Sequence, residues 1–283
     1  VILCLNTVFT QEIRQEQLTD RERLYWDAEN KKIRARGSYY QDDIIGVTNE
    51  KHGKWLFYNA KGNLTEEQHF YRGRIHGKQT SYHPDKRIAS ESYFVFNVAD
   101  SIFREWSPEG QLIVEGFYEM GSPDGEWQYF YDDGSLKSRK QISNDTVYLM
   151  DHYTNDSLHS QVVKAGEGEI KSFYVSGRIK EFYTYAKGLK TGPFEERLAN
   201  GVISILGSFN KGLKNGKWTF YFPNGRIEKC INYKNDIRNG AYLLMNSDST
   251  INTTGNYQAG KKHGDWMWYN KNKAIEMEGS FSD

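Results

Sequence analysis

The seven histidines and two cysteines are the residues that could hold a metal ion. His52, His76 and His263 each stand immediately before a recurring glycine, so their place in a repeat accounts for their recurrence. Cys4 and Cys230 cannot make a disulfide framework, and their spacing to the histidines does not fit a zinc cluster. We therefore predict no metal site.

Paired carboxylates could support acid–base catalysis, but their surroundings argue against it. Asp132 and Asp133 fall at a hairpin-turn position, and Asp42 and Asp43 lie in an insertion, where solvated carboxylates are expected. The segment Gly166–Gly168 lacks the third glycine and the strand-to-helix context of a nucleotide-binding loop, and the sequence has no Gly-x-Ser-x-Gly elbow. The sequence thus predicts no catalytic residue and no cofactor, and the chain is expected not to be an enzyme.

The composition of the 283 residues favours an aromatic-rich β protein. Hydrophobic residues make up 37%, whereas aromatic residues reach 15%, which argues against disorder and against a helical bundle built on Leu and Ala. Lys+Arg and Asp+Glu are both 37, so no global field attracts nucleic acid. We expect no nucleic-acid partner, although local charged patches could still contact an acidic surface.

A period of 24 residues organises most of the chain. Position zero of the repeat is Gly53, Gly77, Ser101, Gly125, Gly168, Gly192, Gly216, Gly240 and Gly264, with one longer gap of 43 after Gly125. Position 11 is always Leu or Ile, from Leu64 to Ile275, and position 17 is aromatic in eight of nine repeats. Position 2 is Trp55, Gln79, Phe103, Trp127, Ile170, Phe194, Trp218, Tyr242 and Trp266. Fixed columns of this kind are typical of a repeat architecture.

Turn residues recur twice in each repeat. Position 9 is Gly in six of nine repeats, and three of these glycines follow Asn or Asp, as in Phe222-Pro-Asn-Gly225. This is typical of a hairpin loop that needs a positive φ. Position 20 carries Gly, Asn or Asp, which tolerate the left-handed region. The repeat is therefore predicted to read strand, turn, strand, turn.

Two segments depart from the period. A first repeat beginning at Glu22 is followed by seven extra residues before Gly53, which we interpret as a loop insertion. Residues near 147–167 form a shortened, degenerate unit, with Tyr153 and Leu158 predicted as its core contributions. Since no repeat can bury its apolar side alone, we treat residues 22–283 as one array of about eleven stacked repeats.

The string Gly-x-Trp-x-x-Tyr-x-x-x-Gly-x-Leu, seen at Gly53–Leu64 and in the variant Gly216–Ile227, resembles the MORN repeat variant of bacterial proteins. The resemblance covers nearly the whole chain. It implies an all-β fold: an elongated, twisted antiparallel sheet of about eleven successive β-hairpin repeats of 24 residues. Bacterial members often carry a YwqK-type antitoxin label, and relatives of the standard repeat are membrane-associated scaffolds. Gln79, Lys86, Ser249 and Lys273 depart from the pattern.

The first residues resemble the end of a signal peptide. Residues 1–10 contain the apolar run Val1–Phe9, and the segment 11–21 that follows is polar. The run is less than half of what a membrane span needs. We predict a signal remnant, hence a periplasmic, secreted or outer-envelope protein; the alternative is an ordinary buried strand, in which case the protein would be cytoplasmic.

Charged residues of the last four complete repeats form one candidate contact surface. Position 22 carries a cation in each of them, and we call this set the cationic column: Lys190, Lys214, Arg238 and Lys262. Hairpins add roughly 10 Å each, so the four cations should follow one edge. They could bind phospholipid head groups or an acidic protein surface, or they could be ordinary solvated residues that protect an edge from aggregation.

Aromatic residues form the second candidate surface. Strand alternation places positions 2 and 4 on one face and position 5 on the other. Position 5 gives what we call the aromatic row: Tyr58, Tyr82, Trp106, Phe130, Phe173, Tyr221 and Tyr269. A single-layer sheet cannot bury both faces, so one set should line a partly exposed groove for a protein, peptide or glycan; the alternative is mutual ring packing that only stabilises the array.

Together these features predict a non-enzymatic repeat scaffold that binds a protein or cell-envelope partner through its aromatic and charged sheet surface. A membrane-surface binder of anionic lipid that uses the cationic column is one alternative. An antitoxin-like protein that neutralises a toxin partner is another.

Overall fold

The computed structural model describes residues 18–19 and 22–282. All regular elements there are β-strands, paired with antiparallel neighbours, and no helix occurs among them, which confirms the all-β prediction. None of the described residues therefore forms a helix that could cross a membrane. The predicted signal remnant 1–10 and all of the segment 11–21 except Leu18 and Thr19 lie outside the described residues.

The chain divides into two compact units, Val1–Thr146 and Val147–Asp283, which we call the N-terminal unit and the C-terminal unit. The division falls where the degenerate segment begins. Each unit is described by itself below.

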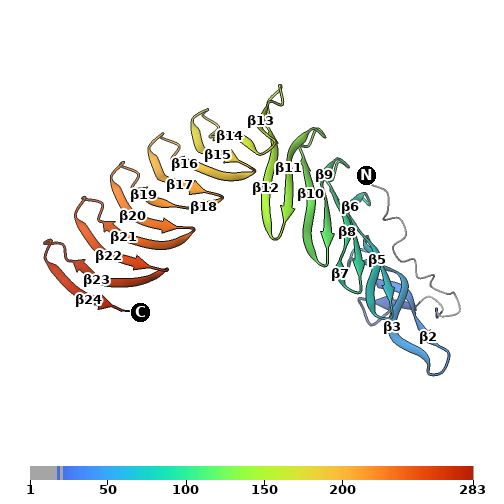
Figure 1. Ribbon diagram of the computed structural model, residues 1–283. Helices are drawn as coiled ribbons and strands as arrows, with labels where there is room; N and C mark the ends of the chain where they lie inside the picture. Colours follow the sequence, from blue (N-terminus) through green and yellow to red (C-terminus); the bar gives the residue numbers. More distant parts are fainter. Residues whose placement is uncertain (1–17, 20–21, 283) are drawn as a thin grey trace. The chain divides into compact units, whose positions relative to one another are not determined.

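The N-terminal unit is a succession of antiparallel hairpins (Figure 1, blue to green). Each strand pairs with its neighbours in sequence, except that the two-residue β7 lets β8 pair with β6. Its strands are β1 (Glu22–Tyr25), β2 (Ile33–Asp42), β3 (Gly46–Tyr58), β4 (Leu64–Tyr71), β5 (Arg74–Tyr82), β6 (Ile88–Val95), β7 (Val98–Ala99), β8 (Ser101–Trp106), β9 (Leu112–Glu119), β10 (Ser122–Phe130) and β11 (Leu136–Ser143).

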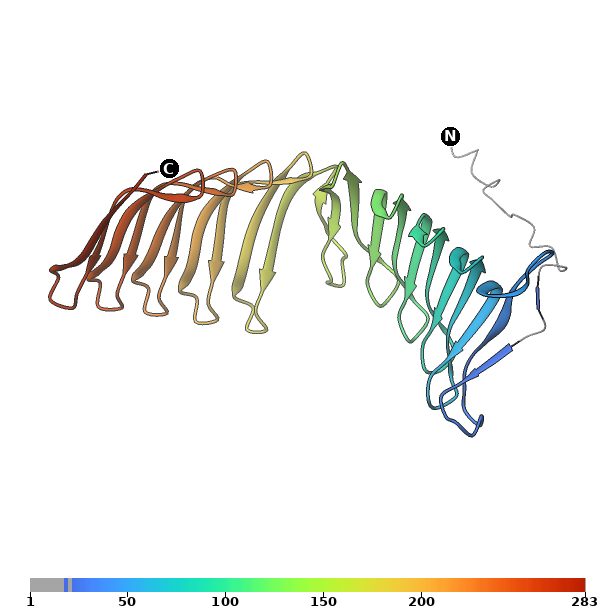
Figure 2. The same ribbon diagram turned by 90° about the horizontal axis from the view of Figure 1, so that it is seen from below.

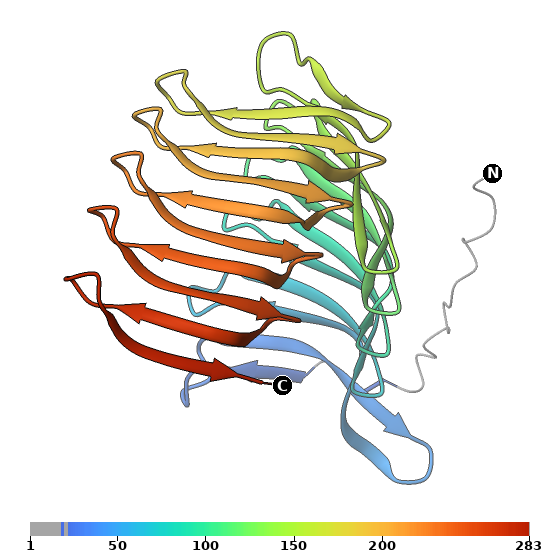
Figure 3. The same cartoon turned by 60° about the vertical axis from the view of Figure 1, so that its left-hand side comes forward.

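The C-terminal unit repeats the same arrangement, with its strands side by side in chain order (Figure 3, yellow to red). Its strands are β12 (Thr146–Tyr153), β13 (Gln161–Lys164), β14 (Glu167–Phe173), β15 (Ile179–Ala186), β16 (Leu189–Arg197), β17 (Ile203–Asn210), β18 (Leu213–Lys214), β19 (Gly216–Tyr221), β20 (Ile227–Lys234), β21 (Ile237–Met245), β22 (Ile251–Gln258), β23 (Lys261–Tyr269) and β24 (Ile275–Phe281).

Both predicted turns are present and need positive φ. Positions 19 and 20 form a two-residue turn in which both residues have positive φ, as in Lys211 (50°) and Gly212 (84°), the geometry that matches the twist of a hairpin. Position 9 also has positive φ, whether it is Gly225 (81°) or Lys86 (73°). Within each unit these loops lie in rows along the edges of the sheet (Figure 2).

Position zero has a role that the sequence analysis did not assign. Its residue has positive φ in every repeat, including Ser101 at 70°. The register to the preceding strand shifts just beside it, for example between Asp124 and Gln128 where β10 meets β9. This bulge interrupts the pairing with the preceding strand between the short turn and position 2, and a bulge of this kind can change the direction of the side chains beside it.

One core prediction for the degenerate segment is wrong. Leu158 is 82% exposed, because it lies in the loop between β12 and β13 and not on a strand. Leu149, Asp151 and Val163 are buried there, and the Asp151 carboxylate accepts hydrogen bonds from the Gln161 side chain and the Ala165 amide.

Candidate functional site

Rings at positions 2 and 17 pack into a buried layer on one face of each unit, which we call the ring face. In the C-terminal unit Phe194 and Trp218 stack at 5.3 Å, and Phe209 meets Trp218 edge-on at 5.2 Å. Tyr242 and Tyr257 contact Trp266 at 5.2 and 5.1 Å. These distances are typical of favourable aromatic pairs. Packing of these rings against one another therefore stabilises the stacking of the repeats.

Every tryptophan at position 2 lies on a glycine at position 15 of the preceding repeat. The four pairs are Gly37 with Trp55, Gly116 with Trp127, Gly207 with Trp218, and Gly255 with Trp266. A Cβ added at any of these glycines would lie within 3.0 Å of indole carbons, so only glycine leaves room. The indole N–H of Trp266 also donates to the Asn256 carbonyl at 3.0 Å. This column was not predicted, although the sequence carries its signal: Trp stands at position 2 only where the preceding repeat has Gly at position 15.

The cationic column lies over this ring layer. The Lys190 Nζ is 3.7 Å from the Tyr183 ring centroid, and the Lys214 Nζ is 4.8 Å from that of Trp218. The Lys262 Nζ is 4.5 Å from the Trp266 centroid, and the Arg238 guanidinium is 5.2 Å from that of Tyr257. These are cation–π distances. The four cations therefore lie against the rings and are not ordinary solvated edge residues.

Backbone bonds fix the column in place. The carbonyls of Lys190, Lys214 and Arg238 accept amide hydrogen bonds from the next turn, from Gly212, Asp236 and Gly260, at 2.8–3.0 Å. Burial lowers the pKa of Lys190, and a hydrogen bond from Arg238 to the Tyr257 hydroxyl raises the pKa of the guanidinium. Three further lysines lie close to the column in sequence: Lys187 and Lys211 lie in the turns themselves, and Lys261 begins β23.

The aromatic row lies at the loop end of the hairpins and is half-exposed, with Phe173 at 56%. Each ring pairs across the hairpin with the aliphatic residue at position 11. In the N-terminal unit the pairs form what we call the apolar stripe: Tyr58 with Leu64, Tyr82 with Ile88, Trp106 with Leu112, and Phe130 with Leu136. In the C-terminal unit the row is interrupted, because position 5 is Arg197 and Met245 in two of the repeats.

Ion pairs flank the apolar stripe on the face opposite the rings. Lys54 meets Glu67 at 2.6 Å, Lys78 meets Glu91 at 2.5 Å, and Arg104 meets Glu115 at 2.5 Å. Each pair joins the two strands of one hairpin. The result is an apolar row bordered by charges of both signs, the composition that protein-binding surfaces often have at their centre and rim.

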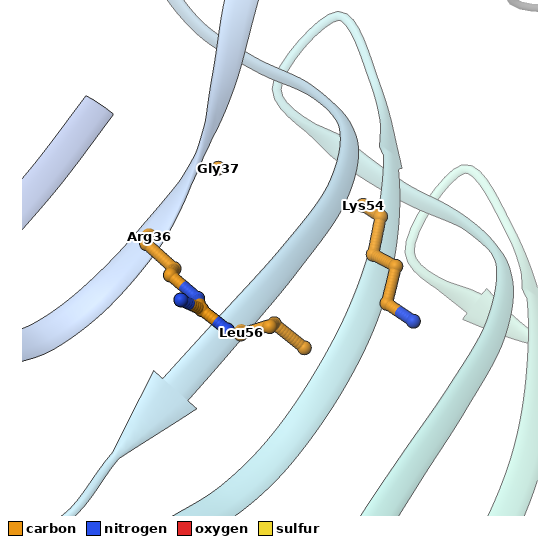
Figure 4. A pocket seen from close by; sticks show the side chains of 4 residues that line it. All are labelled: Arg36, Gly37, Lys54 and Leu56. Atoms are coloured by element: carbon orange, nitrogen blue, oxygen red, sulfur yellow. The ribbon is translucent and has the colours of Figure 1, made fainter. Parts of the chain in front are cut away.

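Two hollows in the described part of the chain are each lined by residues of neighbouring strands. One of about 180 Å³ is lined by Arg36, Gly37, Lys54 and Leu56 from β2 and β3; Arg36 extends toward Leu56, and Lys54 stands apart from both (Figure 4). Another, of about 230 Å³, includes Ile251 and Tyr269. Neither brings ionisable groups of distant repeats together.

The histidines before position zero serve packing in this structure. His52 is fully buried; its Nδ1 accepts the Arg72 amide at 3.1 Å, and its ring packs between Tyr40 and Tyr71. Burial lowers the pKa of His52, and the positive charge of Arg72 lowers it further. Across the described residues, no three His, Cys, Asp or Glu side chains gather as a metal site would require. Cys230 is a buried free thiol.

These features define an all-β repeat protein with a packed ring face. Its opposite face carries ion pairs and a row of half-exposed rings. Three segments, residues 51–70, 123–144 and 214–235, match the family model described as MORN repeat variant. The resemblance inferred from the sequence is thus confirmed at three places in the chain.

Likeness to other known proteins is distant. No curated protein matches the chain. Among solved structures it is similar to a chain of the Photorhabdus luminescens Tc holotoxin pore, at 9% identity and a TM-score of 0.22, over 91% of this chain and 18% of that one. It is also similar to a chain in the crystal structure of TcdB2-TccC3-Cdc42, at 9% identity and a TM-score of 0.20, over 86% of this chain and 16% of that one. The chain thus spans less than a fifth of the length of these proteins.

Proposed function

We propose that this protein is a non-enzymatic scaffold that binds a protein partner, and that the apolar stripe of the N-terminal unit is the contact surface. The supporting observation is the stripe itself: four half-exposed rings, each paired with a branched aliphatic residue, in four consecutive hairpins. Neighbouring hairpins are roughly 10 Å apart, so the row is about 30 Å long, which suits a protein surface better than a small molecule.

The chemistry of the stripe fits this role. Tyr and Trp supply large, rigid contact area and are enriched where proteins bind one another. The flanking ion pairs keep the stripe hydrated at its border and restrict which partners fit. The same rings are not needed for the core, because the buried tryptophans lie on the opposite face.

A matched pair of variants tests the proposal. Tyr82→Ser with Trp106→Ser removes the centre of the stripe, while Phe173→Ser with Tyr221→Ser removes two rings from the interrupted row of the C-terminal unit. Both variants and the parent chain are used as bait for quantitative affinity proteomics in native cells. We expect a partner that is lost at least tenfold from the first variant and retained by the second. Partners that are captured equally by all three baits would contradict the assignment.

Lipid binding by the cationic column is the alternative, and its test is separate. Lys190, Lys214, Arg238 and Lys262 already contact rings, so a head group would have to compete with those contacts. Co-sedimentation with phosphatidylserine vesicles across a salt series measures this binding. Salt-sensitive binding that is lost when the four charges are reversed to Glu would favour the lipid reading over the protein partner.

Two finer expectations stay predictions. Toxin neutralisation would be one form of protein binding; it requires a toxin-like reading frame next to the gene, and deletion of this chain alone should then be toxic. A location outside the cytoplasm rests on residues 1–10, and export of a reporter fused behind the native N-terminus checks it.

A further inference from the structure

The shortened unit near residues 147–167 leaves part of a strand without a neighbour. In a full repeat the strand after the short turn pairs with the strand before it over most of its length, as β16 does with β15 from Leu189 to Glu196. β13 has only four residues, whereas β15 has eight, and β14 pairs with β13 at Glu167 and Gly168 alone. Among the described residues, no strand pairs with the other side of residues 169–173, which we call the open edge of β14.

Apolar side chains at the end of this edge are exposed. Phe173 is 56% exposed, whereas the other six rings of the aromatic row are partly buried. Val175, just after β14, is fully exposed. An unpaired strand edge beside exposed apolar residues is a surface that accepts a further strand from another chain.

Full repeats show the register that such a strand would take. Where β6 pairs with β8, Glu91 at position 14 faces Arg104 at position 3 of the next repeat. Phe182 of β15 faces Glu195 of β16 at the same two positions. Position 3 of β14 is Lys171. A strand that is added antiparallel in this register would therefore place the residue equivalent to Glu91 against Lys171.

Charge along the edge selects the residues of the added strand. Glu169 and Lys171 are exposed on one face of β14, and Phe173 ends the same strand. The added strand would carry, from its N-terminus, an apolar residue beside Phe173, an acidic residue against Lys171 and a basic residue against Glu169. The Lys171 ammonium is 3.7 Å from the Glu169 carboxylate, an exposed pair of little energy that the added charges can replace.

We propose that the open edge of β14 is a docking site for an extended segment of a protein partner with the pattern apolar-x-acidic-x-basic, which completes the sheet at the shortened unit. Main-chain hydrogen bonds along the edge supply affinity, and Lys171 and Phe173 select the sequence and its register. The site goes beyond the function proposed above, because it adds a second surface in the C-terminal unit, whereas the apolar stripe lies in the N-terminal unit.

A peptide of residues 86–95 with Ala89→Leu and Tyr93→Lys has the required pattern and is the probe. A fluorescent label on the peptide allows its binding to the full chain to be followed by anisotropy at low salt. The control is the same peptide with Glu91→Lys. We expect saturable binding of the probe and binding about fivefold weaker for the control, since like charges would then face each other across the edge. Equal binding of the two peptides would overturn the proposal.

Charge reversal in the chain tests the register. Lys171→Glu should weaken binding of the probe about fivefold and restore binding of the Glu91→Lys peptide, because the facing charges are again opposite. Lys234→Glu makes the same change of charge at an exposed residue near the turn after β20 and should bind both peptides as the parent does. Melting temperatures show that both variants are folded. Loss of probe binding in Lys171→Glu without rescue by the reversed peptide would overturn the proposal.

Hydrogen exchange places the bound peptide. The probe should slow amide exchange in residues 169–173, and slowing confined to another segment would overturn the assignment. The stripe variant Tyr82→Ser with Trp106→Ser should still bind the probe, so failure of the stripe and failure of the open edge are distinguished. Sedimentation of the chain alone tests self-association. A dimer in which residues 169–173 are protected from exchange would overturn the choice of partner and assign the edge to a second copy.

Discussion

The N-terminal and C-terminal units use the same repeat but differ at two surface columns. At position 22 the C-terminal unit has Lys190, Lys214, Arg238 and Lys262 over its rings, whereas the N-terminal unit has Lys51, followed by Ile75, Ala99 and Pro123. At position 5 the contrast is reversed: the N-terminal unit carries four rings without a break, and Arg197 and Met245 interrupt the row in the C-terminal unit. The cations that cover buried rings are thus concentrated in the C-terminal unit, whereas the unbroken row of half-exposed rings is in the N-terminal unit.

What the two units share is equally informative. Each contains two tryptophans seated on glycines, and each turns its chain with the same pairs of positive-φ residues. The shared positions are those where a change of side chain would clash or strain the backbone. The positions that differ are at the surface, where a repeat protein can change its partners without changing its stacking.

The largest effect is expected from filling a glycine slot. Gly116→Ala in the N-terminal unit and Gly207→Ala in the C-terminal unit should each lower the free energy of unfolding by about 3 kcal/mol, because the new Cβ forces an indole out of its place. Hydrogen exchange measured peptide by peptide should show the loss mainly in the strands next to the substituted residue. Gly279→Ala is the control and should have little effect.

If only one of the two substitutions lowered the free energy of unfolding, the similarity between the units would not hold. The glycine slots would then be alike in structure but different in energy. Exchange that rises throughout the altered unit would instead show that stacking is cooperative well beyond nearest neighbours.

The second effect concerns the cover over the rings. Lys214→Glu should lower the free energy of unfolding of the C-terminal unit by about 1–2 kcal/mol, since a carboxylate is repelled by the ring faces of Trp218 and Tyr233. Lys214→Ile introduces the residue that the N-terminal unit has at Ile75 and should be nearly neutral. Urea unfolding followed by tryptophan fluorescence measures both. Equal losses for Ile and Glu would show that the charge matters more than the apolar stem.

The third effect is a pH dependence that belongs to the N-terminal unit. Burial lowers the pKa of His52 and of His76 below the ordinary value of 6.5. In the C-terminal unit this position is Thr191, Asn215 and Asn239 in three repeats, and only the last repeat has a histidine there, His263. As the pH falls below that value, the unfolded state takes up protons that the folded state does not, so the free energy of unfolding decreases. Above it, both states are neutral and the contribution is fully present.

Urea midpoints between about pH 7.5 and about pH 5.5, with hydrogen exchange to separate the units, measure this dependence. The His52→Gln variant should have a shallower pH slope, whatever its stability at neutral pH. A slope of the same size in the C-terminal unit would show that the buried histidines are not its source.

The repeat could be predicted from the sequence because its turns need residues that leave a visible column. Position 9 and position 20 require positive φ, so Gly, Asn and Asp recur there at a fixed spacing. The glycine slots were equally readable, yet they appear only when position 15 of one repeat is compared with position 2 of the next. Position 15 alone, with Gln68, Ser92 and Lys140 among its residues, shows no rule.

The packing of the cationic column onto the rings could not be predicted from such a column of residues. A cation close to a turn suggests a solvated edge, but the turn takes up only positions 19 and 20, and strands such as β16 and β23 begin at position 21. Position 22 is therefore already in the strand, where alternation and the bulge at position zero direct the Lys214 side chain onto the rings. The prediction that Leu158 is a core residue was wrong for a related reason. In a shortened repeat, the buried positions can no longer be counted from the 24-residue spacing.

The smallest effect is expected from the position 9 residues that are not glycine. Lys86 in the N-terminal unit and Ser249 in the C-terminal unit have φ values of 73° and 69°, which cost an L-residue about 1 kcal/mol. Lys86→Gly and Ser249→Gly should each raise the free energy of unfolding by about 0.5 kcal/mol, since the relief of strain exceeds the greater flexibility of glycine in the unfolded chain. Gly62→Ala and Gly225→Ala, the reverse changes, should lower it by about 1 kcal/mol. Replicate urea curves resolve these differences, and a gain in only one unit would show that the loops, like the surface columns, have different roles in the two units.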